Sequence, residues 1–391
     1  MDLERLTASP IGTVVPLRLP DPLTRKTVDG HAFLPEPLPV EVQLSTSTWT
    51  TVNRATASLA RLDGTARLIP NPGLLRRPAL RREAQSTSAL EGTYAPIADV
   101  LAADQAQTDL PAALREVLNF EQMAELAFSW PDDRRLTISM LGDLQQTLVT
   151  GTASELGDAG QIRNRVVVIG SRGRPLADAR FVPPPPGDQL RSGVEALLDW
   201  IETPPELPTV VQAAMAHYQF ETLHPYSDGN GRLGRLLVIV QLLRGAIIRE
   251  PLLVVSPWFE ARRTAYQDEL LDLSCTGDWD RWIAFFAEGV AASAEESRSK
   301  VEGLLGLQTD LRARVHAAGK RGAAERLAAD LVGRPYVSRP EVARLYELSG
   351  QGAANAIQAL QAVGILEPSG FRTPAGAEVF RAPDVLTLLT S

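Results

Sequence analysis

A glycine-rich run, His-Pro-Tyr-Ser-Asp-Gly-Asn-Gly-Arg-Leu-Gly-Arg, occupies residues 224–235 and joins two segments with helical patterns. Before the run, apolar residues from Val210 to Tyr218 recur at the spacing of one helix face. After it, residues 236–243 are apolar on all sides except at Gln241, which is typical of a helix in the middle of a bundle. The pattern therefore predicts a helical bundle organised around a polar turn.

The residue types in this turn predict an anion site. Gly229, Asn230 and Gly231 can adopt left-handed or otherwise strained backbone angles, so their amides can open into the first turn of the next helix. Unpaired amides and the positive end of the helix dipole attract anions. Arg232 and Arg235 are three residues apart, so they share one face of that turn and can bind two phosphate groups.

Two further side chains of the run carry chemistry. A lone carboxylate beside phosphates, here Asp228, most often holds Mg²⁺. His224 is the group in the run that can accept a proton near neutral pH. Each feature alone has a structural explanation, because a histidine after a helix is usually a packed residue and glycines there usually form a C-cap and turn. Folding alone does not require all of them at one helix start, so we favour a phosphate-transfer site.

The run resembles the motif of the Fic family, His-x-Phe-x-(Asp/Glu)-Gly-Asn-Gly-Arg-x-x-Arg, with Tyr226 in place of the phenylalanine. Family members mostly transfer the AMP of ATP onto a hydroxyl side chain of a protein. The resemblance implies that ATP is the substrate, that His224 deprotonates the hydroxyl and that Asp228 holds Mg²⁺ on the α- and β-phosphates. It assigns nucleotide binding to Gly229, Asn230, Gly231, Arg232, Leu233, Gly234 and Arg235.

Composition places the chain among ordinary globular proteins. Its 391 residues are enough for two or three domains, and a net charge of −8 does not favour nucleic-acid binding. No apolar run reaches the length of a membrane-spanning helix, and the acidic N-terminus lacks an apolar signal core. The single cysteine, Cys275, excludes internal disulfides and cysteine-based metal clusters. We therefore expect a cytoplasmic protein that does not enter a membrane.

The expected fold class is mainly α: a Fic-fold helical bundle with a β-hairpin flap, followed by a C-terminal winged-helix (α+β) domain. Residues 1–95 are expected to form an N-terminal arm and an inhibitory helix, residues 96–318 the catalytic core, and residues 322–391 the winged-helix module. Within the first of these, residues 1 to about 50 are rich in proline and polar residues, which predicts an extended arm.

The segment Thr87–Gly92 has two interpretations. Structurally it is a helix C-terminus with Gly92 as the cap. By resemblance it fits the family's inhibitory helix, whose pattern is Ser/Thr-x-x-x-Glu-Gly/Asn. The resemblance implies that Glu91 pairs with Arg235 and removes the partner that the γ-phosphate needs, leaving ATP in a pose unsuited to attack.

Residues 161–182 predict a hairpin within this helical protein. A β-branched stretch ends at Ile169, residues 170–173 form a turn, and residues 179–182 can return as a strand. The hairpin could be purely structural. By resemblance it is the family's flap, which pairs with an extended piece of the target protein through backbone hydrogen bonds.

The C-terminal third adds two expectations. In the helix expected at residues 256–273, the family often has asparagine where this chain has Arg262, so the choice of nucleotide stays open. Helices at 323–332, after Ser338 and at 350–363, followed by strands at 365–367 and 378–380, give the winged-helix pattern. The third of these helices contains neither arginine nor lysine, so a protein-interaction or dimer-forming role is favoured over DNA binding.

Two alternatives to the adenylyltransferase remain. One is a DNA-binding transcriptional regulator in which the Fic core acts as a sensor, although an intact His224 and Asp228 argue against an inactive core. The other is a Fic enzyme that uses another nucleotide or removes AMP, with Glu91 orienting a water. Self-modification and a homodimer are also compatible with the sequence.

Overall fold

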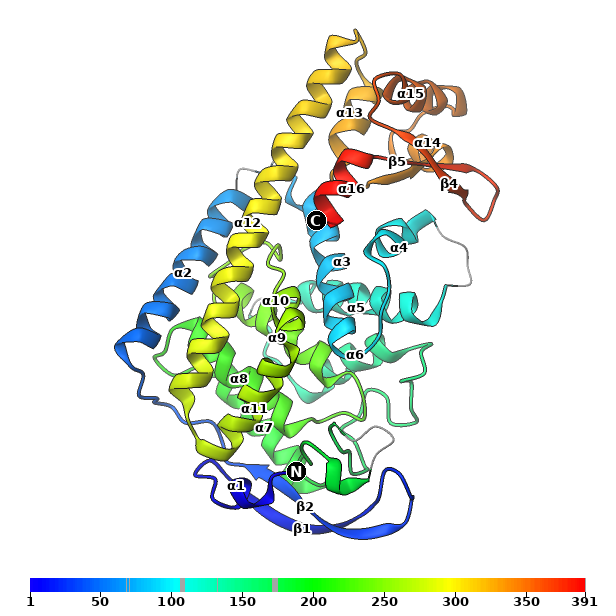
Figure 1. Cartoon of the computed structure of the whole chain (residues 1–391). Coiled ribbons are helices and arrows are strands. Elements are labelled where there is room, and N and C mark those ends of the chain that lie inside the picture. Colours follow the sequence, from blue (N-terminus) through cyan, green and yellow to red (C-terminus); the bar gives the residue numbers. More distant parts are fainter. Residues whose placement is uncertain (68, 70, 106–109, 132, 171–174, 391) are drawn as a thin grey trace. The chain divides into compact units, whose positions relative to one another are not determined.

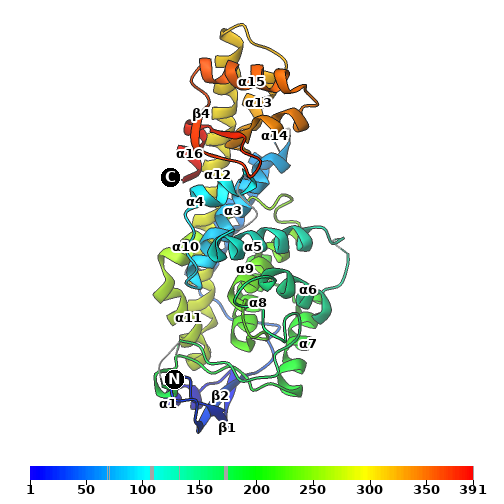
Figure 2. The same cartoon turned by 90° about the vertical axis from the view of Figure 1, so that its right-hand side faces the viewer.

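The computed structural model describes every residue except 68, 70, 106–109, 132, 171–174 and 391. The chain is mainly helical and forms two compact units (Figures 1 and 2). The first unit contains Met1–Leu59, Asn119–Ile247 and Val255–Ala292, and the second contains Ala60–Leu118, Ile248–Val254 and Ser293–Ser391. In the described part of the chain, no helix combines the length and the apolar character needed to cross a membrane.

Two antiparallel neighbours, α8 (Thr209–Leu223) and α9 (Asn230–Arg244), form the centre of the first unit (Figure 1). Every residue of α9 from Asn230 to Leu242 is buried, which confirms the central helix predicted from the apolar stretch 236–243. α7 (Asp188–Glu202) packs against α8, and α6 (Ile138–Val149) packs against both α7 and α9. The loop between α8 and α9 is therefore held at both ends by buried helices.

The remaining helices of this unit follow the predicted pattern with two exceptions, the first being a short helix at Leu3–Thr7 within the segment expected to be an extended arm. The helix expected at residues 256–273 is divided at Arg262, whose φ of −120° and ψ of 27° are not helical. The bounds are α1 (Leu3–Thr7), α10 (Ser256–Ala261) and α11 (Arg263–Thr276), and three long helices contribute residues to both units: α2 (Thr46–Ala66), α5 (Ala112–Phe128) and α12 (Trp279–Ala317).

Residues 12–35 form an antiparallel hairpin that was not predicted. β1 (Gly12–Pro20) pairs with β2 (Thr27–Pro35) in a register that sets Gly12 opposite Pro35. Prolines had indicated an extended arm, but β1 is an edge strand, and an edge strand tolerates proline because its outward N–H needs no partner. On the other side of the hairpin, the Phe33 N–H donates to the Val182 carbonyl over 2.9 Å. The hairpin therefore braces the segment that follows the flap turn.

The second unit contains α3 and the C-terminal elements. Its sheet has the antiparallel order β3–β5–β4. The helices expected after residue 322 and the strand expected at 378–380 are present. The strand expected at 365–367 forms at 367–372 instead, and β3 is an additional strand; assignment to the winged-helix class stays a prediction. The bounds are α3 (Pro72–Leu90), α4 (Ile97–Ala102), η1 (Ala103–Gln105), α13 (Ala323–Asp330), β3 (Tyr336–Ser338), α14 (Arg339–Leu345), α15 (Gly350–Ala362), β4 (Glu367–Arg372), β5 (Glu378–Arg381) and α16 (Pro383–Thr390).

His217 of α8 makes the stability of the first unit depend on pH. Its Nε2 lies 2.7 Å from the Tyr266 hydroxyl, and its ring stacks on Trp282. Burial, and then the charge of Arg235, lower the pKa of His217 to about 3. The unfolded chain, with a histidine pKa near 6.5, therefore binds more protons below that pH, and stability is lost as the pH falls from about 6.5 towards 3.

We expect His217→Phe to flatten this pH dependence. Between pH 7 and pH 5 the wild type should lose about 2 kcal/mol of unfolding free energy through this histidine, a loss that the variant lacks. Urea unfolding followed by tryptophan fluorescence measures it. His316→Phe, at an exposed position of α12, should keep the wild-type profile. Parallel profiles for wild type and His217→Phe would contradict the prediction.

Candidate active site

His224 forms the C-cap of α8 in a left-handed conformation, with φ 49° and ψ 60°. Such a backbone costs a residue other than glycine of the order of 1–3 kcal/mol, so its surroundings must hold it. The ring Nδ1 lies 3.3 Å from the Glu221 carbonyl oxygen. Because a carbonyl only accepts, this contact puts the proton on Nδ1 and leaves Nε2 as the nitrogen able to accept one.

The turn between His224 and α9 is closed by Asn230. Its side-chain oxygen accepts from the Tyr226 N–H over 2.8 Å, and its amide donates to the Tyr226 carbonyl over 2.7 Å. Of the three residues expected to allow an unusual backbone, only Gly229 is left-handed, with φ 84°, because α9 already begins at Asn230. A Cβ atom at Gly229 would lie 2.8 Å from the Leu148 side chain, so both space and backbone require glycine.

Asn230→Ala should lower the free energy of unfolding by about 2–4 kcal/mol, because it leaves a buried N–H and a buried carbonyl of Tyr226 without partners. Chemical denaturation of the purified variant measures the loss. Asn164→Ala removes an exposed asparagine from a neighbouring segment and should change stability by less than about 0.5 kcal/mol. Equal effects of the two substitutions would show that the bonds of Asn230 contribute nothing specific.

Asp228 presents a carboxylate that is oriented by its neighbours and whose side chain is 39% exposed. One oxygen accepts from the Gly229 N–H over 2.6 Å and from Arg232 over 3.3 Å, and the other accepts from the Ser154 hydroxyl over 2.7 Å. No group of three or more histidine, cysteine or acidic side chains suited to a metal occurs among the described residues. A cation at Asp228 would take most of its ligands from water and phosphate, a donor set that suits Mg²⁺.

Arg232 and Arg235 lie in the first two turns of α9, and each is only 2% exposed. Two desolvated positive charges at the positive end of a helix favour a multiply charged anion. Leu233 is fully buried, and Gly234 lets α8 approach, since a Cβ atom there would lie 3.1 Å from the Phe220 ring. Leu233 and Gly234 therefore pack the helices together, and their part in nucleotide binding stays a prediction.

Asp158 and Arg165 support the same loop, although no sequence pattern indicated either. The Asp158 carboxylate accepts from Ser227 over 2.6 Å and from Arg165 over 2.7 Å, and Arg165 also donates to the Ser227 hydroxyl over 2.9 Å. Burial alone would raise the pKa of the Asp158 carboxyl, but these hydrogen bonds outweigh it and hold the pKa below its usual value. The Asp158 carboxylate thus anchors Ser227, the residue next to Asp228.

The predicted flap is present only in part. Ile169 and Phe181 form an isolated antiparallel bridge, and residues 171–173 of the predicted turn lie outside the described residues. The backbone of residues 166–168 makes no hydrogen bond to any other described residue. Val166 and Val168 pack against Ala32, Ala179 and Val182, so one face of this extended segment is anchored while its backbone edge is open.

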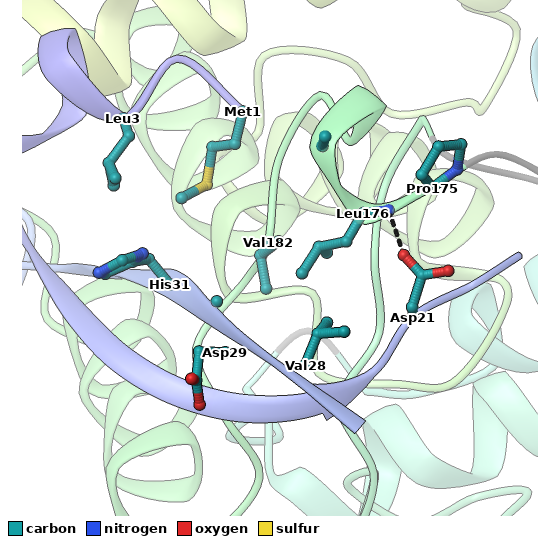
Figure 3. A pocket seen from close by; sticks show the side chains of 11 residues that line it. Met1, Leu3, Asp21, Val28, Asp29, His31, Pro175, Leu176 and Val182 are labelled. Carbon is teal, nitrogen blue, oxygen red and sulfur yellow. Dashed lines mark hydrogen bonds between the residues drawn. The ribbon is translucent and has the colours of Figure 1, made fainter. Parts of the chain in front are cut away.

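A pocket of about 370 Å³ lies where the N-terminal hairpin meets the return limb of the flap (Figure 3). Val28, Leu176 and Val182 line its apolar floor. Leu176 begins the short helix η2 (Leu176–Asp178) at the edge of the pocket, and its N–H donates to the Asp21 carboxylate over 2.7 Å. This hydrogen bond, with others from Thr24, lowers the pKa of Asp21. The hairpin therefore holds the flap limb at two points, through Asp21 and through Phe33.

Glu91 lies at the exposed C-cap of α3, in the second unit. The following Gly92 is left-handed, with φ 91°, and the N–H of Thr93 donates to the Ser88 carbonyl over 2.9 Å. This is the glycine-capped helix end expected from the sequence. The pairing of Glu91 with Arg235 stays a prediction.

Comparison with protein families identifies this architecture. Residues 49–129 match the N-terminal model of the Fic/DOC family, and residues 135–242, which contain the loop from His224 to Arg235, match the Fic/DOC family model. The chain contains the N-terminal region and the Fic domain of the Fic/DOC family. The helices α8 and α9 that carry the loop are therefore part of a Fic domain.

Known relatives of this Fic chain are similar over limited lengths. It is 32% identical over 133 residues to "Protein adenylyltransferase Fic" of Drosophila willistoni and 33% identical over 141 residues to that of Nematostella vectensis. These matches cover 34% and 36% of the chain but only 23% and 29% of the relatives. The chain thus aligns with less than a third of either relative.

Solved structures support the fold alone. A Fic family protein from Desulfovibrio desulfuricans G20 has a TM-score of 0.57 at 20% identity, covering 87% of this chain and 97% of its own. Fic-1 of Caenorhabditis elegans has a TM-score of 0.50 at 17% identity, covering 66% and 73%. The expectation of a mainly α Fic fold is confirmed.

Proposed function

We propose that the protein is a protein adenylyltransferase that transfers AMP from ATP to a serine, threonine or tyrosine hydroxyl of a target protein. The observation that carries the proposal is the loop between α8 and α9. In it, a histidine with a defined tautomer precedes a half-exposed carboxylate and two buried arginines at one helix start. The adenylyltransferase names of the relatives support this activity.

The first turn of α9 would bind the phosphates of ATP. Its amides and the guanidinium groups of Arg232 and Arg235 carry the positive charge, with Arg235 reaching the γ-phosphate. Asp228 would hold Mg²⁺ together with water and phosphate oxygens. The bound ion would offset part of the negative charge of the triphosphate.

His224 would act as the general base. Its Nε2 takes the proton of the target hydroxyl while that oxygen attacks the α-phosphorus of ATP. The bond between the α-phosphorus and the bridging oxygen to the β-phosphate breaks, and pyrophosphate leaves with its charge held by Arg232 and Arg235. The products are the AMP-modified side chain, pyrophosphate and a proton on His224.

The open backbone edge of residues 166–168 would bind the target. An extended target segment can add to such an edge as a further strand, with main-chain hydrogen bonds providing most of the affinity. The anchoring of Val166 and Val168 on the hairpin side keeps this edge extended before the target arrives. Recognition through backbone atoms would demand little target sequence, and it allows the protein itself to be a substrate.

DNA binding by residues 322–391 is less well supported. The exposed polar side chains of α15 are Gln351, Asn355 and Gln358, which can contact bases but supply no charge for phosphates. A protein-interaction or dimer-forming role therefore fits this segment better.

The nucleobase that the site accepts stays open. At a position where the family often has asparagine, this chain has Arg262, whose guanidinium lies 4.4 Å from the centroid of the Trp258 ring.

The proposal is tested by incubating the purified protein with Mg²⁺ and ATP labelled at either the α- or the γ-phosphate, alone and with lysate proteins. We expect stable label on protein from α-labelled ATP only. Competition with unlabelled GTP, CTP and UTP establishes the nucleotide preference. Protein labelled only by γ-labelled ATP, or protein stripped of AMP instead of gaining it, would overturn the proposal.

A further inference from the structure

Arg163 is almost completely buried, at 1% exposure, near the start of the flap segment, residues 161–182. Its guanidinium donates to the carbonyls of His224 over 2.8 Å, Arg165 over 2.9 Å and Pro184 over 2.5 Å, and more weakly to Leu223 over 3.4 Å. Its backbone N–H donates to the Pro225 carbonyl over 2.9 Å. One residue therefore contacts the two residues on either side of His224 and His224 itself.

The acceptors of the Arg163 guanidinium are backbone carbonyls, and among the described residues no carboxylate lies within ion-pair distance of it. Burial lowers the pKa of Arg163 to about 10, which leaves it protonated at neutral pH. A buried cation is costly, and packing alone could be achieved by a neutral side chain. The cation instead meets the last carbonyls of α8, the negative end of that helix.

The acceptors of Arg163 belong to three different segments. Leu223 and His224 end α8, Arg165 lies in the first limb of the flap, and Pro184 follows the flap. A guanidinium is planar and has a fixed fork of donors, so it can hold several carbonyls in one geometry. Because His224 has a left-handed backbone, its peptide planes need such support to keep Nδ1 on the Glu221 carbonyl.

We propose that Arg163 is a positioning residue that fixes the imidazole of His224 and couples it to both ends of the flap. The proposal rests on the proposed function, in which His224 is the general base. Holding the carbonyls of Leu223 and His224 sets the backbone angles of His224 and thereby its tautomer. The same guanidinium holds the Arg165 and Pro184 carbonyls at the two ends of the flap. The position of His224 relative to the backbone edge that binds the target is therefore kept constant.

The coupling between His224 and the flap is tested by activity measurements on Arg163→Lys. Lysine keeps the charge but cannot span four carbonyls with its one nitrogen. We expect kcat for adenylyl transfer to fall by about tenfold to a hundredfold, with KM for ATP within about twofold of wild type. Arg191→Lys is the matched control, because Arg191 is exposed on α7 and paired with Glu195. An unchanged kcat in folded Arg163→Lys would overturn the proposal.

The tautomer of His224 tests it without relying on activity. In protein labelled with ¹⁵N-histidine, the His224 signals are assigned by their loss in His224→Ala. We expect wild type to carry the neutral proton on Nδ1, and Arg163→Lys and Arg163→Gln to show a mixture of tautomers. A merely structural role would lower the melting temperature and leave the ring signals unchanged, which would overturn the proposal.

The wild-type spectrum keeps the inference falsifiable if both variants fail to fold, because a proton on Nε2 in wild type contradicts it directly. The proposed function and the positioning role of Arg163 can also be refuted separately. Absence of adenylyl transfer by wild type would overturn the proposed function, whereas the ring signals decide whether Arg163 positions His224.

Discussion

His224→Ala should lower the rate of adenylyl transfer by about 10²–10⁴-fold, the usual contribution of a positioned general base. The imidazole is the group of the loop that can accept the hydroxyl proton, and its bond to the Glu221 carbonyl directs Nε2 to that task. Single-turnover transfer of α-labelled AMP to protein measures the rate. Binding of ATP, measured by calorimetry, should change little because the phosphates are held by α9.

His316→Ala provides the control for this experiment, since it removes an exposed histidine from α12 and should leave transfer unchanged. A variant that retained the wild-type rate would show that another group takes the proton.

Glu91→Gly should raise transfer by about tenfold or more. The expected cause is the release of Arg235, because a hydrogen bond to a charged group contributes about 1.5–3 kcal/mol and its removal returns the arginine to the γ-phosphate. The initial rate of label transfer from α-labelled ATP, compared between variant and wild type, gives the increase. A rate equal to or below that of wild type would refute the inhibitory role.

The matched control is Glu347→Gly. Glu347 is also exposed just after a helix, and its φ of 54° suits glycine, so the substitution causes no strain. The double variant Glu91→Gly, His224→Ala makes the interpretation specific. It should return to the rate of His224→Ala alone, because relief of inhibition acts only through a working base.

The central helices could be predicted because the pattern of their apolar side chains indicates burial. Residues 236–243 of α9 are apolar on all sides except at Gln241, a composition typical of a buried helix. The candidate residues of the motif could also be predicted, because they are adjacent in the sequence, in the loop after α8 and the first turns of α9. By contrast, the sequence does not predict the N-terminal hairpin, because the prolines of the first 50 residues are compatible with a free arm as well as with edge strands, which contain Pro16, Pro20 and Pro35.

Residues that act through distant backbone atoms left no signal in the sequence. Arg163 bonds to carbonyls, which every residue possesses, so nothing in the sequence of its partners marks them. Asp158 and Ser154 reach the loop only through folding. The flap was predicted as two strands, yet only the Ile169–Phe181 bridge forms in the described residues, because the strand-forming valines at 166–168 have no partner within the described chain.

The hydrogen bonds of the Asn230 carboxamide also affect how fast this residue deamidates. An asparagine followed by glycine, as at Asn230-Gly231, is the dipeptide most prone to deamidation, in which the next backbone nitrogen attacks the side-chain carbonyl carbon. Here the carboxamide is bonded on both its oxygen and its nitrogen, and Gly231 already belongs to a helix. The attacking nitrogen therefore cannot reach its target while the loop is folded, and chemical decay at this position is limited by local opening.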